Sequence, residues 1–205
     1  MEQNRKLFQI FKTENEKIKI IIHNVLVMLG NRIYVDGEGK KHPLLDVTKT
    51  EKSIEDRGDN KYVFTTDNGE LYALKIIFQK ISGTGKQSAI SDFINEYPKH
   101  KKIIVAYDYN NKIVEYVAKH RAQIFREHFF LQDIISYRDQ PKFELLTPSE
   151  MEMVKKEYNI TEYTAEKMFR SDPVARYFGL KKGDIIRIIR PSPTAGEAIA
   201  YRIVI

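Results

Sequence analysis

The sequence predicts an α+β protein in two parts, an N-terminal α/β domain with a mixed sheet and a compact C-terminal α/β module with a small sheet. Three observations predict this class. Segments with helical and strand-like spacing alternate along the chain, as expected where helices pack on a sheet. The segment Asp67–Gly69 separates two strand-like runs, and its Asn and Gly tolerate the positive φ of a hairpin turn. The segment Thr147–Glu150 has the pattern of a helix capping box.

The elements of the N-terminal domain follow from the spacing of apolar residues. A first helix that ends near Gly30 is predicted by a set of residues at helical spacing: Leu7, Ile10, Phe11, Ile18, Ile21, Ile22 and Val25. The polar stretch 35–60 is expected to be a loop. Strands are predicted over 62–66, 70–78, 102–107 and 122–130, and helices over 89–97 and 111–119.

The C-terminal module contains residues that are typical of helix ends and turns, and these residues predict its elements. One helix is predicted to start at Thr147, and a second is predicted to start at Asp172 and to end at Gly179. Strands are predicted over 185–189 and 199–205, with a turn over 191–196 between them. The polar segment 137–141 ends in proline and is typical of a linker, so we place the domains at 1–137 and 138–205.

Composition narrows the class of protein. A chain of 205 residues that is 42% hydrophobic can bury a core, and we expect neither a membrane span nor secretion. The absence of cysteine excludes disulfides, thiolate metal sites and a cysteine nucleophile. The net charge of +6 favours nucleic acid or an acidic partner, although many soluble proteins carry it without such a role. Lys and Arg are spread along the whole chain, which weakens the case for direct binding.

Catalytic and metal-binding patterns are incomplete. Gly83–Ser88 lacks the first glycine and the final Ser or Thr of a phosphate loop. A nuclease would need acidic residues and a lysine around a divalent metal, and only scattered candidates are present. These are Asp108 or Asp67 with Lys75, and the fragment Glu38-Gly-Lys40. The five histidines lack the spacing of a zinc hydrolase: His23, His42, His100, His120 and His128. We therefore expect no catalytic residue, no metal and no cofactor.

Two C-terminal segments resemble a known family. They are Asp172-Pro-Val-Ala-Arg-Tyr-Phe-Gly-Leu-Lys-Lys-Gly183 and Ile188-Ile-Arg-Pro-Ser-Pro-Thr-Ala-Gly196, the latter followed by Ala200-Tyr-Arg202. Together they are similar to the signature of the fifth subunit shared by the eukaryotic nuclear RNA polymerases, a family that also has an archaeal member. The match is strong from about Thr147 to Tyr201, and upstream only the order of elements is similar. The length resembles the eukaryotic form, which has an N-terminal jaw domain that the archaeal form lacks.

The chain also departs from the family pattern at three places. Phe143 stands where the family often has His, and Ala165-Glu166 stands for a Leu-Pro pair. Glu197-Ala198 stands where the family has Arg-Tyr. This drift resembles a fast-evolving copy, and we expect the homologue of a large cytoplasmic DNA virus of the asfarvirus type.

The resemblance implies a non-catalytic subunit of a multisubunit DNA-directed RNA polymerase. Its C-terminal module would dock on the largest subunit, and its jaw domain would lie near downstream double-stranded DNA. The implied partner-binding residues are Asp172, Pro173, Arg176, Tyr177, Lys181, Lys182, Arg187, Arg190, Thr194, Gly196, Tyr201 and Arg202. Asp172 and Pro173 are also expected to start the helix, and Thr194 and Gly196 to shape the turn. The DNA-proximal candidates are Lys99, Lys101, Lys102 and Lys119.

The resemblance also implies where the protein acts in the cell, and two alternative functions remain open. A viral homologue would act in the host cytoplasm, in the virus factory, and in the virion, whereas a cellular homologue would act in the nucleus. The first alternative is a nuclease-fold DNA-processing protein, which would cleave DNA in the presence of magnesium. The second is a free transcription regulator that has borrowed the module, which would be found mostly outside the polymerase.

Overall fold

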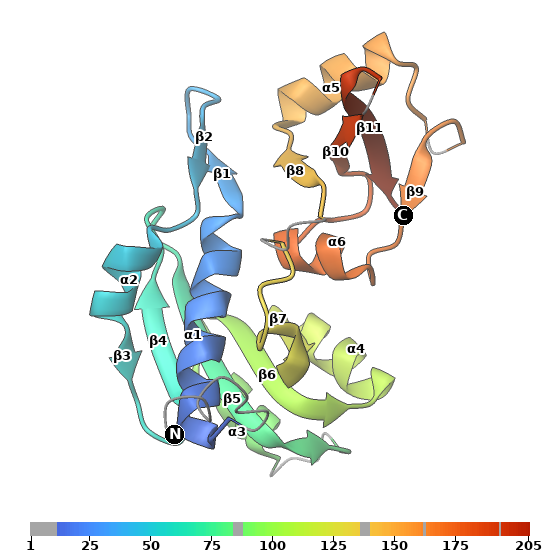
Figure 1. Cartoon of the computed structure of the whole chain (residues 1–205). Helices are drawn as coiled ribbons and strands as arrows, with labels where there is room; N and C mark the ends of the chain where they lie inside the picture. Colours follow the sequence, from blue (N-terminus) through green and yellow to red (C-terminus); the bar gives the residue numbers. More distant parts are fainter. Residues whose placement is uncertain (1–11, 84–87, 136–139, 162, 193) are drawn as a thin grey trace, which may run out of the picture. The chain divides into compact units, whose positions relative to one another are not determined.

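The chain divides into two compact units in the computed structural model (Figure 1). The structure describes residues 12–83, 88–135, 140–161, 163–192 and 194–205. The N-terminal unit contains Met1–Val27 and Asp46–Asp133, and the C-terminal unit contains Met28–Leu45 and Ile134–Ile205. The division expected from the sequence, at residue 137, assigns residues 28–45 to the N-terminal domain. Their contacts place them in the C-terminal unit, because they bind residues beyond position 134.

The N-terminal unit is built on a five-stranded sheet of order β3-β4-β5-β6-β7. Its strands are β3 Glu55–Asp56, β4 Lys61–Thr65, β5 Leu71–Ile81, β6 Lys101–Tyr109 and β7 Ala122–Arg126. The β3–β4 and β4–β5 pairs are antiparallel, and the β5–β6 and β6–β7 pairs are parallel. The predicted mixed sheet is therefore confirmed, as is the hairpin at Asp67–Gly69, where Gly69 has φ of +82°.

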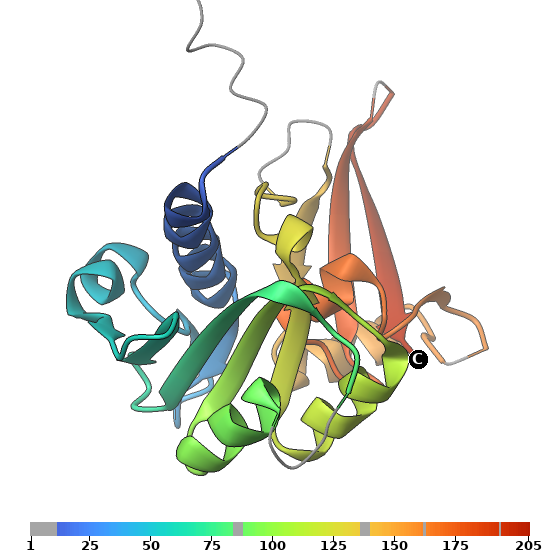
Figure 2. The same cartoon turned by 90° about the horizontal axis from the view of Figure 1, so that it is seen from below.

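Helices cover both faces of this sheet (Figure 2). The helices α3 Ala89–Glu96 and α4 Asn111–Lys119 form the two parallel crossovers and enclose a core with Ala73, Ile104 and Ile124. Ser88 caps α3 and Asn110 caps α4, each accepting a backbone N–H three residues on, as expected of good N-cap residues. Helix α1 Glu14–Gly30 lies on the opposite face, and its last three residues belong to the C-terminal unit.

Two predictions for the N-terminal part are wrong. The stretch 35–60 is not a loop, because it contains the end of β1 Ile33–Val35, β2 Lys41–Pro43, α2 Val47–Ser53 and β3. The predicted strand 122–130 ends at Arg126 and continues as the 3₁₀ turn η2 Glu127–Phe129. The predicted first helix is confirmed from Glu14 onward, whereas Leu7, Ile10 and Phe11 lie outside the described residues.

The C-terminal unit contains a four-stranded sheet of order β8-β10-β11-β9 and the separate β1–β2 hairpin. Its other elements are β8 Lys142–Leu145, α5 Pro148–Glu157, β9 Glu166–Met168, α6 Pro173–Phe178, β10 Ile185–Ser192 and β11 Gly196–Val204. Helix α5 packs on one face of this sheet, where Val154 meets Ile185 and Ile203. The two helices and the final hairpin are confirmed, but β10 and β11 reach further into the predicted turn, to Ser192 and Gly196.

Thr147 begins α5 as the capping-box motif predicts. Its hydroxyl oxygen accepts the N–H of Glu150 at 3.2 Å, and the Glu150 carboxylate accepts the N–H of Thr147 at 2.6 Å. We expect Thr147→Ala to lower the free energy of unfolding by about 1 kcal/mol, because the helix loses one half of this reciprocal cap. Urea denaturation of the full chain measures the loss. Thr48→Ala, at an exposed position of α2, is the control, and an equal effect there would contradict the prediction.

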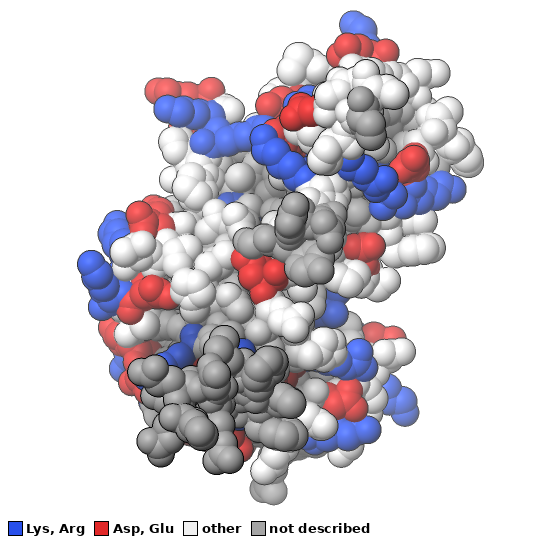
Figure 3. Space-filling view, viewed as in Figure 1, with Lys and Arg blue, Asp and Glu red and all other residues white. Residues whose placement is uncertain are grey.

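Charged side chains are mixed in sign over the visible face of both units (Figure 3). Many form local pairs, such as Lys61 with Glu96 and Lys49 with Asp67. Among the helices of the described residues, none is long and apolar enough to span a bilayer.

Candidate functional site

The helix α6, which carries the first signature segment, is held at both ends. Asp172 is its N-cap, with a carboxylate oxygen that accepts the N–H of Val174 at 2.8 Å, and Pro173 fixes the first turn. Gly179 ends the helix in the left-handed region at φ of +68°. These three residues act locally, so most of this part of the signature has a structural reason.

The C-terminal end of α6 is capped by an arginine from the other end of the chain. Arg32 donates from Nε to the carbonyl of Tyr177 at 2.8 Å and from Nη2 to the carbonyl of Arg176 at 3.1 Å. A helix leaves its last carbonyls without partners inside the helix, and a cation there also opposes the helix dipole favourably. A β-carbon on Gly179 would lie 3.2 Å from the Arg32 guanidinium carbon. A larger residue at position 179 would therefore be strained by the backbone angle, and it would also require the guanidinium to shift by a few tenths of an ångström.

Tyr177 is buried, contrary to its expected role as a surface contact. The residue is only 3% exposed, and its hydroxyl accepts a hydrogen bond from Asn31 Nδ2 at 2.8 Å. Tyr177 therefore anchors the segment that follows α1. Nothing in the sequence marks Asn31 and Arg32 as partners of α6, because a polar pair after a helix has no distinctive pattern.

A charged and aromatic row crosses three strands on one face of the C-terminal sheet. Glu144 on β8 binds Lys142 at 2.9 Å and Arg187 on β10 at 3.3 Å. Arg187 in turn donates from Nε to the hydroxyl of Tyr201 on β11 at 3.2 Å, and the Tyr201 ring packs on Tyr158. The hydrogen bond from Lys142, with help from Arg187, lowers the pKa of Glu144, so this carboxylate stays ionised at neutral pH.

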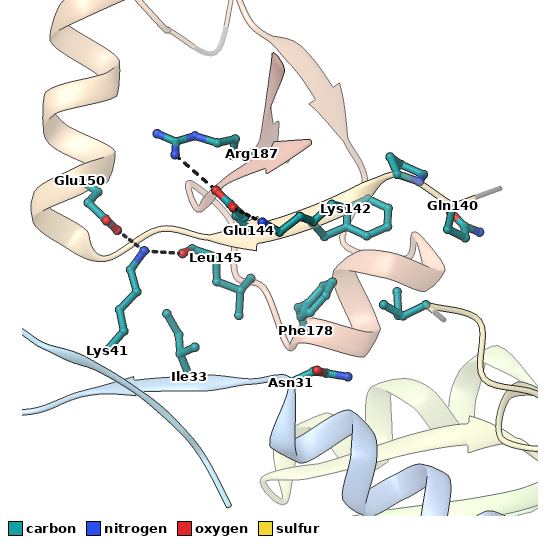
Figure 4. A pocket seen from close by; sticks show the side chains of 13 residues that line it. Asn31, Ile33, Lys41, Gln140, Lys142, Glu144, Leu145, Glu150, Phe178 and Arg187 are labelled. Carbon is teal, nitrogen blue, oxygen red and sulfur yellow. Dashed lines mark hydrogen bonds and ion pairs between the residues drawn. The ribbon is translucent and has the colours of Figure 1, made fainter. Parts of the chain in front are cut away.

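A cavity of about 660 Å³ lies beside the outer edge of β8, within the C-terminal unit (Figure 4). Leu145 and Phe178 contribute apolar walls, and Ile33 faces them from β1. Lys41 closes one end, where its ammonium donates to the carbonyl of Leu145 at 2.8 Å and pairs with Glu150 at 2.5 Å. Burial raises the pKa of Glu150, but its hydrogen bonds with Lys41 and Thr147 outweigh burial and lower it overall.

The structure separates the predicted partner-binding residues into two groups. Several of these residues already make contacts within the unit, as described above. Arg202 also does so, because its Nε binds Glu166 at 3.1 Å. The others are exposed to solvent or half-buried. Exposed members are Pro173, Lys181, Lys182, Arg190, Thr194 and Gly196. Arg176 and Tyr201 are half-buried.

The four predicted DNA-proximal lysines lie near the end of the N-terminal sheet at which β6 and β7 begin, but one of them is not accessible. Lys99, Lys101 and Lys119 are exposed. Lys102 is 3% exposed, and its ammonium donates to the carbonyls of His100 at 3.0 Å and His120 at 3.4 Å. A direct contact between Lys102 and DNA is therefore excluded by its burial in the strand.

The candidate nuclease residues do not come together. Asp108 pairs with Arg126 at 3.0 Å and Lys80 at 3.2 Å, and these hydrogen bonds lower the pKa of its carboxyl. Lys75 instead binds Asp59, and Asp67 accepts the N–H of Asp46. Among the described ranges, no group of three or more His, Asp or Glu side chains is arranged to hold a metal ion. Residues 84–87 of the segment Gly83–Ser88, which was considered as a phosphate loop, lie outside the described residues.

Comparison with known proteins defines the class of this chain. Residues 132–204 match the family described as RNA polymerase Rpb5, C-terminal domain. This range contains both signature segments and the sheet that carries the charged and aromatic row. The C-terminal unit is therefore an Rpb5-type module to which the chain adds Met28–Leu45.

Full-length relatives extend the match to the N-terminal unit. The chain is 55% identical to DNA-directed RNA polymerase subunit 5 of Acanthamoeba polyphaga mimivirus, over the whole length of both proteins. It is 28% identical to a subunit of RNA polymerases I, II and III of Dictyostelium discoideum, over 99% of each chain. It is also 48% identical to subunit Rpo5 of Methanocaldococcus jannaschii, over 32% of this chain and 83% of that protein. The chain therefore belongs to the family of subunit 5 of DNA-directed RNA polymerases, and it is a non-catalytic polymerase subunit.

Proposed function

We propose that this chain docks on the largest subunit of its RNA polymerase through the C-terminal module and places its N-terminal unit near downstream DNA. Nucleotide addition then takes place in the large subunits, and this chain contributes to assembly and to holding the template. The family membership supports the role as a subunit. The observation that carries the docking proposal is that part of the signature faces solvent without an internal use.

Three signature cations provide the docking contacts in this proposal. Lys181 and Lys182 follow α6, and Arg190 lies on β10, and all three residues are exposed. Within the described residues, none of the three side chains makes a hydrogen bond or an ion pair. Cations without a partner among the described residues can bind acidic groups of another subunit, and arginine is enriched among strong interface contacts. Arg176 is a weaker candidate, because this residue is half-buried and already interacts within the chain.

Co-purification with the cognate largest subunit tests the docking proposal. We expect the tagged native chain to retain the largest subunit and the variant Lys181→Glu/Lys182→Glu/Arg190→Glu to lose it at least about tenfold, because reversed charges repel the acidic partner. The matched control is Lys19→Glu/Lys52→Glu/Lys112→Glu, which makes the same charge change at exposed positions of the N-terminal unit. Circular dichroism verifies folding. Retention by the first variant, or equal loss by the control, would overturn the proposed docking face.

The placement near DNA and the location in the cell complete the proposal. Lys99, Lys101 and Lys119 remain the candidates for phosphate contact. The mimivirus relative supports a viral origin, in which the chain acts in the host cytoplasm, in the virus factory, and is packaged in the virion. The asfarvirus type stays a prediction, and a cellular homologue would act in the nucleus.

A further inference from the structure

The strand β8 forms one edge of the C-terminal sheet, and its outer side has main-chain groups that no strand pairs with. In the sheet order β8-β10-β11-β9, only β10 pairs with β8. Lys41 donates to the carbonyl of Leu145 at 2.8 Å from the outer side, so the main-chain groups of Leu145 point away from β10. Because every second residue of a strand has its N–H and carbonyl on the same side, those of Phe143 point outward as well.

Most of these outward groups are open to another chain. Within the described ranges, the N–H and carbonyl of Phe143 and the N–H of Leu145 make no hydrogen bond outside the pairing of β8 with β10. The carbonyl of Leu145 is occupied by Lys41, which ends the open stretch. An open strand edge is a template for pairing with an extended segment of another chain. β8 can therefore accept an added strand at Phe143 and Leu145.

The cavity along this edge supplies space and an apolar wall. Its volume of about 660 Å³ is in the range of sites that enclose a ligand (Figure 4). The ring of Phe143 packs against that of Phe178, with 6.0 Å between the centroids, and Leu145 and Ile33 line the same cavity. Phe143, Leu145 and Ile33 are only half-buried. Part of their apolar surface is therefore left to contact the side chains of a ligand.

The opposite face of β8 carries more positive than negative charge. Lys142 and Glu144 alternate with Phe143 along the strand, so their side chains lie on the other face of the sheet. Arg187 of β10 joins them there, and both cations pair with the single carboxylate of Glu144. The side chain of Lys142 is 70% exposed at the open edge. Two cations that share one carboxylate favour a further acidic group on this side of an added strand.

We infer that an extended segment of a partner protein binds by strand addition at this edge, in what we call the β8 groove. The groove comprises Ile33, Lys142, Phe143, Leu145, Phe178 and Arg187. Side chains of a strand alternate between its faces, so the segment has apolar residues on the side of Phe178 and acidic residues beside Lys142. Main-chain hydrogen bonds give such a complex its affinity, and the alternating side chains give it specificity.

Fluorescence anisotropy of the full chain with a labelled probe peptide, Glu-Val-Glu-Val-Glu-Val, tests the alternation and the charge. We expect the probe to bind at least about tenfold more tightly than Glu-Glu-Glu-Val-Val-Val, which has the same composition without the alternation. Lys142→Glu should weaken probe binding about tenfold and transfer the preference to Lys-Val-Lys-Val-Lys-Val. The matched control is Lys167→Glu, at an exposed position of β9 on the opposite edge of the sheet. Equal affinity for the first two peptides, or an equal loss in the control, would overturn the groove.

Amide hydrogen exchange measures the added strand directly and needs no variant. In the free chain, the N–H groups of Phe143 and Leu145 should exchange faster than that of Glu144, which points toward β10. A saturating amount of the probe should slow exchange at Phe143 and Leu145 about tenfold or more and leave Glu144 nearly unchanged. A probe methylated at its backbone nitrogens should give no protection, because it cannot donate to β8. Probe binding without protection of Phe143 and Leu145 would rule out strand addition.

Two further measurements separate the β8 groove from the proposed docking face and from self-association. The variant Lys181→Glu/Lys182→Glu/Arg190→Glu should bind the probe like the native chain, because none of these three residues lines the groove. Loss of probe binding in this variant would assign the probe to the docking face and overturn the groove. Without the probe, protection of Phe143 should not depend on protein concentration. Protection that rises with concentration would assign the groove to a second copy of the chain instead of a partner protein.

Discussion

Replacing Arg32 by alanine is expected to lower the free energy of unfolding of the C-terminal unit by about 3 kcal/mol. The guanidinium makes two hydrogen bonds to the last turn of α6, and bonds to a charged group each contribute about 1.5 to 3 kcal/mol. Hydrogen exchange with increasing urea measures the loss in α6 separately from the N-terminal unit. Arg57→Ala is the control, because this exposed arginine forms an ion pair with the exposed Glu55, and we expect such a surface pair to contribute little.

A double-mutant cycle with Gly179 shows whether the guanidinium is the cause. In the native background, Gly179→Ala should cost about 2 kcal/mol, of which about 1 comes from the left-handed backbone and the rest from displacing Arg32. In the Arg32→Ala background, only the backbone cost of about 1 kcal/mol should remain. Equal costs in both backgrounds would mean that Arg32 does not constrain position 179.

Replacing Lys17 by methionine is expected to destabilise the N-terminal unit by about 2 to 3 kcal/mol. Lys17 on α1 lies 2.6 Å from Glu127, whose side chain is only 8% exposed. Removing one partner leaves a buried carboxylate without compensation, which costs about 3 to 5 kcal/mol for fully buried pairs. The Lys17 side chain is 28% exposed, so this pair is only partly buried, and we expect the smaller loss of about 2 to 3 kcal/mol. Urea denaturation followed by circular dichroism measures it.

A rescue variant and a control variant test whether the pair of Lys17 and Glu127 causes this loss of stability. Adding Glu127→Gln to Lys17→Met should restore most of the lost stability, because a neutral amide is less costly to bury than a carboxylate. Lys19→Met changes an exposed lysine of the same helix and should have an effect below about 0.5 kcal/mol. If both lysine variants had the same small effect, the pair would have no role in holding α1.

The elements predicted correctly from the sequence are those whose ends have local chemistry. The capping box at Thr147, the Asp-Pro start at Asp172 and the hairpin glycine at Gly69 each act within a few residues of the chain. The strands that were missed are short and depend on distant partners. β8 has four residues and pairs with β10, some forty positions later, and β9 has three and pairs in parallel with β11. No local pattern marks such strands.

The same distinction explains the outcome for the candidate residues. Lys181 and Lys182 could be predicted to face solvent, because they follow a helix whose end at Gly179 is clear from the sequence. Tyr177 and Lys102 could not be judged from the sequence. The burial of Tyr177 depends on Asn31, and that of Lys102 depends on two carbonyls supplied by separate turns. An exposed or buried role for a polar side chain is decided by such tertiary partners.

The contact of Arg32 with α6 has a consequence for the order in which the protein forms during synthesis. The two partners are separated by 145 residues. At about 5 to 20 residues per second, the ribosome releases Arg32 roughly 7 to 30 s before Tyr177. The last strand of the N-terminal sheet ends at Arg126. This unit can therefore fold before the C-terminal residues that contact the β1–β2 region have been synthesised. The docking that we propose therefore becomes possible only after the last strands have left the ribosome and the C-terminal end of α6 has bound Arg32.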